Sequence, residues 1–455
     1  MKKLLIYTLA VLSSGMAVAQ EINDVNTPLH LMKPQYETPY GVPQQTEVKA
    51  TLSRVFDFLE SAMPCEAEGN KLKQGTLRLT SYEIGVLYAA ALDAGKYAED
   101  ERYTLFTNNR LGLIANMYAK SKKEIAKNQD FDPQMRKVCN PTALDDAGAM
   151  CSAYVRMALA KGGKVSKEEQ QVIENYISFV YTKQYRLSDG IFGRIRPHYN
   201  TVWLDDMYMG VPCLAWYGRL TGKQEYIDEA VKQIRLFKER MWVPEKLLFR
   251  HGWVEEMNSH PAFHWGRANG WAVLTLCEVL DAMPKEHKDR AFVLDLLKQH
   301  LEGLCRLQHK TGFWHQLLDN PDTYLETSAT AIFTYCLAHA INEGWVDPLA
   351  YGAQTYLAWN AVATKVNAKG QVEGTCVGSG MGFDPAFYAY RPVHVMAAHG
   401  YGPVVWAGAE MLRLLQNTHP KMNDSAVHLY PTEQKTNEPI FSEKREGVEE
   451  EKVLW

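Results

Sequence analysis

Several features that define large protein classes are missing from this chain of 455 residues. Positive charge is not in excess, since 49 Lys and Arg residues stand against 53 Asp and Glu, a formal net charge of −4. A nucleic-acid partner requires a strongly basic surface and is therefore not expected. Beyond the N-terminal region, no segment approaches the roughly 18 uninterrupted apolar residues of a membrane span, so the mature chain is not expected to insert into a membrane.

Cysteine is also scarce, with eight residues and no Cys-x-x-Cys pair. In a chain of this length the pattern indicates neither a disulfide framework nor a zinc site. The sequence has no Gly-rich phosphate loop, no Gly-x-Ser-x-Gly elbow and no His-Glu-x-x-His motif, the signatures of nucleotide binding, serine hydrolysis and zinc proteolysis. Four cysteines in apolar helical segments are predicted to be small buried hydrophobes: Cys151, Cys213, Cys277 and Cys336.

The N-terminus has the pattern of a secretory signal. Met1-Lys2-Lys3 supplies the positive region, an apolar run follows, and Ala17-Val18-Ala19 matches the cleavage consensus. We expect residues 1–19 to be removed after Ala19, which places the mature protein in the periplasm or outside the cell. Residues 20–45 are expected to form an N-terminal extension.

Helical periodicity dominates the remaining chain. Segments such as 81–94 and 329–340 are small and apolar on nearly all faces, whereas 223–240 and 288–308 have one charged face. This alternation of inner and outer helices predicts an all-α fold, an (α/α)6 barrel of about twelve helices over 46–418, followed by a polar tail, 419–455. The expected helices are 47–62, 82–95, 102–127, 143–161, 167–185, 204–221, 224–240, 268–283, 288–308, 327–343, 347–364 and 402–416.

Long linkers precede the inner helices and carry most of the aromatic, His, Gly and Pro residues. Because loops on a rigid scaffold concentrate binding groups, we expect these linkers to wall one open end of the barrel. These linkers are residues 186–203, 242–267, 309–326 and 366–401.

The most informative segment is Asn200 to Pro212, which sets Asp205 and Asp206 among aromatic and thioether side chains. An acid beside apolar surface resists ionisation because burial penalises its charged form. Such an acid can act as a proton donor near neutral pH. The alternative is that the pair only caps a helix, a common use of Asp.

A second motif lies at 264–271, where two indoles, a guanidinium and an amide suit a sugar: rings stack on its apolar faces and polar groups bond its hydroxyls. A Trp-rich helix cap is the alternative. A second acid pair starts an inner helix, with Asp145 expected to cap and Asp146 able to face the lumen. The candidate binding residues are Tyr82, Arg194, His198, Trp203, His264, Trp265, Arg267, Asn269, Trp271, His315 and His399. For Tyr82, His315 and His399, core packing, hydrogen bonding or capping remain alternatives.

Four ordered motifs, NTVWLDDMYMGVP, HWGRANGW, WHQLLDNPDTYLETSATAIF and HGYGPVVWAGAEM, resemble the unsaturated rhamnogalacturonyl hydrolases of glycoside hydrolase family 105, which are related to the unsaturated glucuronyl hydrolases of family 88. The resemblance covers about Tyr82 to Met411. It implies an (α/α)6 barrel without metal or organic cofactor, acting on oligosaccharides with a terminal 4,5-unsaturated uronic acid. It also implies that an aspartic acid protonates C4 while water adds at C5, after which the hemiketal opens.

By motif, Asp205 matches the acid of the family and Asp146 the second aspartate, while Asp206 is expected to be a structural neighbour. The segment from Trp265 to Trp271 matches the sugar-binding motif of the family. We expect the apolar wall and Asp146 to raise the pKa of Asp205. We expect Arg267, Asn269 and His264 to bind the uronate carboxylate.

Two positions depart from the family: Arg194 stands where some members have His, and Tyr82 where Trp is frequent. Either could shift the preferred adjoining sugar, and Arg194 could read an anionic neighbour. A glycosidase of saturated uronosides and a non-catalytic periplasmic oligosaccharide-binding protein are the alternative functions. The residues leave open galacturonate or glucuronate, the adjoining sugar, the parent polysaccharide and the oligomeric state. They also leave open the choice between Asp205 and Asp206 as the acid, because a shift of one residue in the motif match would exchange the two.

Overall fold

The structure is a computed structural model that describes residues 39, 41–260, 262–422 and 427–431. The predicted signal peptide, nearly all of the predicted extension and residues 432–455 of the predicted tail lie outside the described residues. No helix in the described part of the chain combines the length and apolar character needed to cross a membrane.

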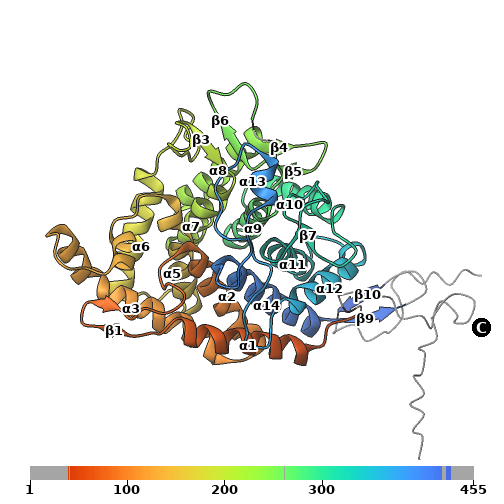
Figure 1. Cartoon of the computed structure of the whole chain (residues 1–455), viewed down its shortest axis with the longest axis horizontal. Helices are drawn as coiled ribbons and strands as arrows, with labels where there is room; N and C mark the ends of the chain where they lie inside the picture. Colours follow the sequence, from red (N-terminus) through yellow and green to blue (C-terminus); the bar gives the residue numbers. More distant parts are fainter. Residues whose placement is uncertain (1–38, 40, 261, 423–426, 432–455) are drawn as a thin grey trace, which may run out of the picture. The chain divides into compact units, whose positions relative to one another are not determined.

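Within the described residues, six inner helices form a closed ring, which Figure 1 shows nearly end-on. Each packs on the next, and the last packs on the first. Their residues are small and apolar; in α11, every residue from Thr327 to Ile341 is buried. Such helices bury nearly all their faces, as inner helices must. The ring is α2 (Tyr82–Ala98), α5 (Gly148–Ala160), α7 (Asp205–Thr221), α9 (Gly266–Ala282), α11 (Thr327–Asn342) and α14 (Tyr401–Asn417).

An outer helix covers each inner helix. All of these outer helices except α12, which has no charged residue, carry a charged face. Inner and outer helices alternate along the chain, so the predicted all-α (α/α)6 barrel is confirmed. All eight cysteines are free, and the four predicted to be small buried hydrophobes are buried. The outer helices are α1 (Gln45–Ala62), α3 (Glu101–Ala126), α6 (Lys167–Ser178), α8 (Gln224–Met241), α10 (Arg290–Cys305) and α12 (Pro348–Thr364).

Local differences from the predicted helices have identifiable causes. The helix expected over 143–161 begins only at Gly148, after the 3-10 turn η2 (Leu144–Asp146), because the Asp146 carboxylate accepts bonds from the amide and hydroxyl of Thr142. Gly148 also lies so close to the Met209 carbonyl of α7 that no larger side chain fits. The helix expected over 167–185 is α-helical to Ser178 and continues as a π-helical turn, η3 (Phe179–Lys183).

Two short helices escaped prediction: α4 (Pro133–Cys139) and α13 (Pro385–Ala389). Each starts with an Asp whose side chain accepts bonds from the first backbone amides, followed by Pro, which suits the first helical turn. The Asp-Pro pairs at 132–133 and 384–385 were therefore usable signals.

Short antiparallel strand pairs complete the loops. The predicted polar tail contains a hairpin, with Leu429 and Tyr430 buried where the hairpin packs on α12, so its first residues are part of the fold. The pairs are β1 (Ala67–Glu68) with β2 (Lys71–Leu72), β3 (Thr201–Trp203) with β6 (Gly252–Val254), β4 (Trp242–Val243) with β5 (Leu248–Phe249), β7 (Trp314–His315) with β8 (Leu325–Glu326), and β9 (Thr418–Met422) with β10 (Val427–Pro431).

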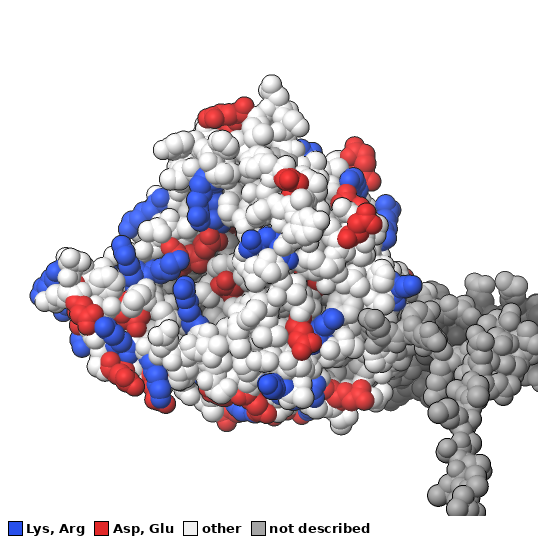
Figure 2. Space-filling view, viewed as in Figure 1, with Lys and Arg blue, Asp and Glu red and all other residues white. Residues whose placement is uncertain are grey.

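Because the outer helices return the chain, all six inner helices run in the same direction. Their N-termini meet at one end of the barrel, together with the long loops and the turn η4 (Ala398–Gly400). The N-terminus of a helix carries a partial positive charge, so this end favours carboxylates and anionic ligands. Figure 2 shows a hollow over α2, α5 and α7, with acidic side chains inside it and basic side chains along its edge.

Candidate active site

Asp205 is held at the first position of α7 by a two-stranded ribbon. Strands β3 and β6 pair so that Trp203 lies opposite Gly252, and the amide of Leu204 donates to the carbonyl of His251. This backbone bond brings a histidine from a distant segment beside the acid. The Nε2 atom of His251 lies 2.8 Å from Oδ2 of Asp205.

The other nitrogen of His251 is also bound. Its Nδ1 lies 2.7 Å from the hydroxyl of Tyr388 on α13, and that hydroxyl accepts a bond from the amide of Gly382. His251 is fully buried, and its ring packs 4.8 Å from that of Trp265. The ring orientation of His251 is therefore set from three sides, which aims Nε2 at Asp205. Neither His251 nor Tyr388 was predicted as a site residue, because their motifs are unremarkable and lie far from Asp205 in sequence.

Arg194 joins two aspartates from different helices. Its guanidinium donates to both carboxylate oxygens of Asp206 at 2.7 and 2.8 Å, and to both of Asp145 at 3.0 Å. It also stacks 4.2 Å from the Trp203 ring. Four of the five N–H groups of the guanidinium thus donate to protein carboxylates. Arg194 therefore clamps η2 to α7, and its predicted role in reading an anionic sugar stays a prediction.

The expected pKa shift at Asp205 was wrong in sign. Burial alone would raise the pKa of Asp205, but the hydrogen bond and charge of His251, with Arg194 and Arg267, bring it below its ordinary value. The pKa that is raised belongs to Asp206, to about 6, because its burial outweighs the attraction of Arg194. Asp206 is 1% exposed and its carboxylate faces Arg194, in keeping with a structural neighbour.

The second predicted aspartate also needs correction. Asp146 turns away from Asp205: its carboxylate pairs with Lys137 at 2.7 Å and accepts the two bonds from Thr142. The member of the pair that joins the site is Asp145, through Arg194. The sequence predicts the opposite arrangement, with Asp145 as the helix cap and Asp146 facing the lumen, because an N-terminal Asp usually caps its helix. In the structure, η2 turns Asp145 inward.

Arg267, at the start of α9, holds the loop that covers the site. Its guanidinium donates to the carbonyls of Cys376 at 2.7 Å and Val377 at 2.9 Å, and stacks 4.6 Å from the Trp265 ring. The amide of Cys376 donates to Glu326, the N-terminal cap of α11. Arg267 is 1% exposed, yet its charge lowers the pKa of Asp205, so it acts electrostatically and by positioning this loop.

Tyr82 and His399 form a neighbouring polar group. The Tyr82 hydroxyl lies 2.5 Å from Nε2 of His399, and Glu83 lies 3.4 Å from the same nitrogen. Burial lowers the pKa of His399 well below its usual value, so the imidazole is neutral at physiological pH.

Several buried polar atoms at this end of the barrel have no hydrogen-bond partner among the described residues. Buried donors and acceptors normally have partners, so these atoms mark places where a polar ligand can bind. They are Glu83 Oε2, Trp203 Nε1, Trp265 Nε1, Tyr324 Oη and His399 Nδ1.

Three other predicted binding residues are buried, with their side chains in contact with protein groups. Asn269 is fully buried, with its amide bonded to both backbone groups of Phe249 and to the Trp265 carbonyl, so it anchors a loop. His264 is 2% exposed and bonds the Phe249 carbonyl. Trp271 is 1% exposed and stacks on Tyr208. Asn, His and Trp residues that bond the backbone or pack in the interior cannot be told from sugar-binding residues of the same types by sequence alone.

The remaining two predicted histidines are His315, at the end of β7, and His198, in a loop. His315 bonds the carbonyl of Thr323 at 2.5 Å, as expected for a satisfied hydrogen-bonding group. His198 is exposed on the loop before β3, with its ring 6.2 Å from that of Phe383. His198 therefore lies at the edge of the barrel mouth. From there it can contact only the part of a bound oligosaccharide that extends outward from the buried residues around Asp205.

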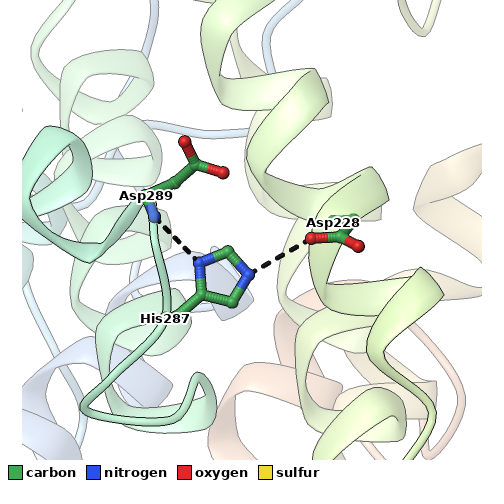
Figure 3. A group of neighbouring side chains, drawn as sticks. All are labelled: Asp228, His287 and Asp289. Atoms are coloured by element: carbon green, nitrogen blue, oxygen red, sulfur yellow. Dashed lines mark hydrogen bonds and ion pairs between the residues drawn. The ribbon is translucent and has the colours of Figure 1, made fainter.

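One group of described side chains has the residue types of a metal site: Asp228, His287 and Asp289 (Figure 3). The bonds within it already use the histidine nitrogens. His287 Nδ1 accepts the Asp289 amide at 3.1 Å, and Nε2 lies 3.2 Å from Asp228. Arg235 pairs with Asp289 at 2.6 Å. The group is explained as a link between α8 and the loop before α10.

A closed helical barrel with clustered carboxylates and unpartnered polar atoms at its mouth defines a carbohydrate-active helical-barrel protein. The chain belongs to Glycosyl Hydrolase Family 88, whose family model matches residues 58–415. It is similar to an unsaturated rhamnogalacturonyl hydrolase, YesR, of Bacillus subtilis, with 33% identity over 28% of this chain and 38% of that protein. It is also similar to an unsaturated 3S-rhamnoglycuronyl hydrolase of Formosa agariphila, with 31% identity over 47% of this chain and 58% of that protein.

The matches therefore span about two fifths and three fifths of the length of these relatives. Among solved structures, a possible member of the GH105 family from Salmonella enterica has a TM-score of 0.66 at 22% identity, covering 85% of this chain and 97% of that one. The unsaturated glucuronyl hydrolase of Bacillus sp. GL1 has a TM-score of 0.54 at 13% identity, covering 80% and 96%. At these identities the likeness concerns the fold.

Proposed function

We propose that the protein is a glycoside hydrolase that removes a 4,5-unsaturated uronic acid from the non-reducing end of lyase-generated oligosaccharides. The observation that carries the proposal is the Asp205–His251 pair at the N-terminal mouth of the barrel. It lies close to Trp203 and Trp265, whose indole nitrogens are buried without partners. The family and the names of the relatives support the same reaction.

The lowered pKa of Asp205 bears on how a proton reaches carbon. In the free enzyme Asp205 is ionised and bonded to His251. A uronate carboxylate entering the site adds negative charge and displaces water, and both effects raise the pKa of Asp205. Asp205 then takes up a proton from solvent and passes it to C4 of the double bond.

Water attacks C5 as the proton adds to C4, and the proton lost by that water returns to the Asp205 carboxylate. The resulting hemiketal at C5 opens to a ketone, the anomeric carbon becomes an aldehyde, and the adjoining sugar leaves as an alcohol. The sum is one unsaturated uronide plus one water, giving a keto sugar acid and the shortened oligosaccharide. No redox partner is required.

The reaction is tested with lyase products of pectin, arabinogalactan and ulvan in D2O and in water labelled with 18O. We expect deuterium at C4, 18O at C5 and loss of the ultraviolet absorbance of the double bond. Asp205→Asn is expected to lose about 10²–10⁴-fold in kcat, the range for general acid–base groups. Asp322→Asn, an exposed acid with the same chemical change, serves as the control.

Two alternatives predict different results. A glycosidase of saturated uronosides would cleave those substrates, leave lyase products untouched and put no label at C4. A non-catalytic oligosaccharide-binding protein would bind lyase products without loss of absorbance, and Asp205→Asn would behave like the parent. The relatives act on rhamnogalacturonyl and 3S-rhamnoglycuronyl substrates by name, so the same panel also ranks galacturonide against glucuronide and plain against sulfated neighbours.

We also propose that the protein is exported, with cleavage after Ala19, as residues 1–19 indicate. N-terminal sequencing of the protein from fractionated native cells tests this. A mature chain that begins at Gln20 in the periplasmic or culture fraction supports it. An intact Met1 in the cytoplasmic fraction contradicts it.

A further inference from the structure

A second cavity, of about 710 Å³, lies at the opposite end of the barrel from Asp205. Its wall comes from the C-terminal halves of the inner helices, including Asp93 of α2, Arg219 of α7 and Tyr335 of α11. Asp205 lies on the first turn of α7 and Arg267 on the first turn of α9, so the two sites lie toward opposite ends of the barrel. Its volume falls in the range of about 300–1,000 Å³ typical of small-molecule sites.

The floor of this cavity is a rigid, fully bonded network. Arg156 pairs with Asp93 at 2.7 Å and with Glu278 at 2.9 Å. The indoles of Trp216 and Trp406 donate to the same two carboxylates and lie 4.7 and 5.4 Å from the guanidinium. The charges of Arg156 and the two carboxylates neutralise one another, and both indole N–H groups have acceptors. These side chains therefore shape the cavity but do not by themselves indicate a ligand.

The wall around the end of α9 is different. Arg219 and Arg290 each donate to one terminal carbonyl, of Asp281 and Leu280, which accounts for one guanidinium nitrogen apiece. Neither has a carboxylate within ion-pair distance in the described part of the chain, nor does Lys285 on the adjoining loop. Three cations with spare donors thus face one cavity. The bond to the C-terminal carbonyls of α9 accounts for one donor of Arg219 and one of Arg290. Within the described residues, the other N–H groups of the two guanidinium groups are free to bind a ligand.

Tyr335 supplies an independent sign of a ligand. Its side chain is 2% exposed and lines the cavity, and the described residues form no hydrogen bond to its hydroxyl. A ligand in the cavity can therefore bond this hydroxyl without displacing a protein partner. The carboxylates of Asp93 and Glu343 line the same space and can accept bonds from ligand hydroxyls.

We propose that the second cavity binds a sugar acid, meaning a small polyhydroxylated monocarboxylate. Its carboxylate pairs with Arg219, Arg290 and Lys285, and its hydroxyls bond Tyr335 and the acidic side chains. A multiply charged anion such as phosphate fits less well, because the wall carries carboxylates that repel it. The proposal stands independently of the proposed reaction at Asp205.

The test uses the full chain with D-glucuronate as the probe, by calorimetric titration and by a crystal soaked in the same compound. We expect density in the second cavity. We expect Arg219→Gln to weaken the corresponding binding event about 10–100-fold, the effect of one charged hydrogen bond. Lys288→Gln, the same charge change at an exposed neighbouring position, is expected to leave binding unchanged. Turnover of lyase products is expected to be unaffected by either variant.

Lys285→Gln, at an exposed position, gives the same readout if Arg219→Gln fails to fold. Tyr335→Phe is expected to weaken D-glucuronate binding without altering turnover. Absence of density in the cavity, binding insensitive to these changes, or equal binding of D-glucose or inorganic phosphate would each overturn the proposal. If neither the parent nor the variants turn over lyase products while D-glucuronate still binds in the second cavity, the proposed reaction is contradicted. The proposal for the second cavity is not affected by that result.

Discussion

Nε2 of His251 lies 2.8 Å from Oδ2 of Asp205, although the two residues are 46 positions apart in the chain. The contact depends on the β3–β6 ribbon and on Tyr388, which binds the opposite nitrogen of the imidazole. It lowers the pKa of the carboxyl that donates the proton in the proposed reaction. Removal of the histidine therefore has a defined consequence for the pH dependence of the proposed reaction.

His251→Gln is expected to lower kcat by about 10²-fold or more, the lower bound for a general acid–base group. Because His251 lowers the pKa of Asp205, its loss raises that pKa. Asp205 must be protonated to donate to C4, so the alkaline limb of kcat/KM is expected to move to higher pH. Tyr388→Phe keeps the imidazole but frees Nδ1, so the expected loss is about tenfold, the value of one hydrogen bond. A pH–rate profile of His251→Gln identical in shape to that of the parent would contradict this role.

Arg194→Gln is expected to destabilise the protein by about 3–5 kcal/mol at pH 7.5, because it leaves buried carboxylates without their cation. The pKa of Asp206 is raised to about 6 even with Arg194 present, and it rises further without it. Protonation at pH 5.5 removes the buried charge, so the difference from the parent shrinks as pH falls. Urea unfolding at the two pH values measures this. Arg196→Gln, an exposed change of the same kind, should shift stability by under about 0.5 kcal/mol.

Asn269→Ala is expected to lower the free energy of unfolding by about 2 kcal/mol or more, since it leaves buried backbone groups of Phe249 without partners. The KM of the folded fraction is expected to be unchanged, because the amide faces the protein interior. Denaturant unfolding and steady-state kinetics on the same preparation separate the two effects. A higher KM at unchanged stability would restore Asn269 as a sugar-binding residue.

His339 links stability to pH at the far end of the barrel. It bonds Asp281 at 3.0 Å and Glu410 at 2.9 Å, and these two carboxylates raise its pKa well above the usual value although burial opposes them. Because the pKa of His339 is higher in the folded than in the unfolded state, the charged imidazole stabilises the fold. This stabilisation is complete below the pKa of the unfolded state, about 6.5, and is lost as pH rises through the pKa of the folded state.

The stability difference between the parent and His339→Gln is therefore expected to be largest near pH 6 and to decrease in alkaline solution. Thermal unfolding of both proteins from pH 6 to 9.5 measures this. His309→Gln, in a loop on an outer part of the barrel, is the matched control. A difference that grows with pH would contradict the assignment of a charged His339.

Periodicity was sufficient to predict the twelve long helices, because inner helices must be apolar on nearly every face while five of the six outer helices keep one charged face. The start of α7 was also predictable, since Asp205 follows Trp203 at the junction of a loop and an apolar helix. Two short helices were missed, although Asp384-Pro385 and Asp132-Pro133 are recognisable starts. Their few residues give too little periodicity to detect.

The sequence by itself determined the barrel, because its helices follow from local periodicity, and it predicts Asp205 as the acid from residues adjacent in the chain. Only the tertiary structure decided which polar groups lie beside Asp205. His251, Tyr388 and Asp145 reach Asp205 or its neighbour through strand pairing and a clamp by Arg194. Asn269 and Asp146 turn elsewhere, because their partners are backbone groups or side chains that local pattern does not reveal.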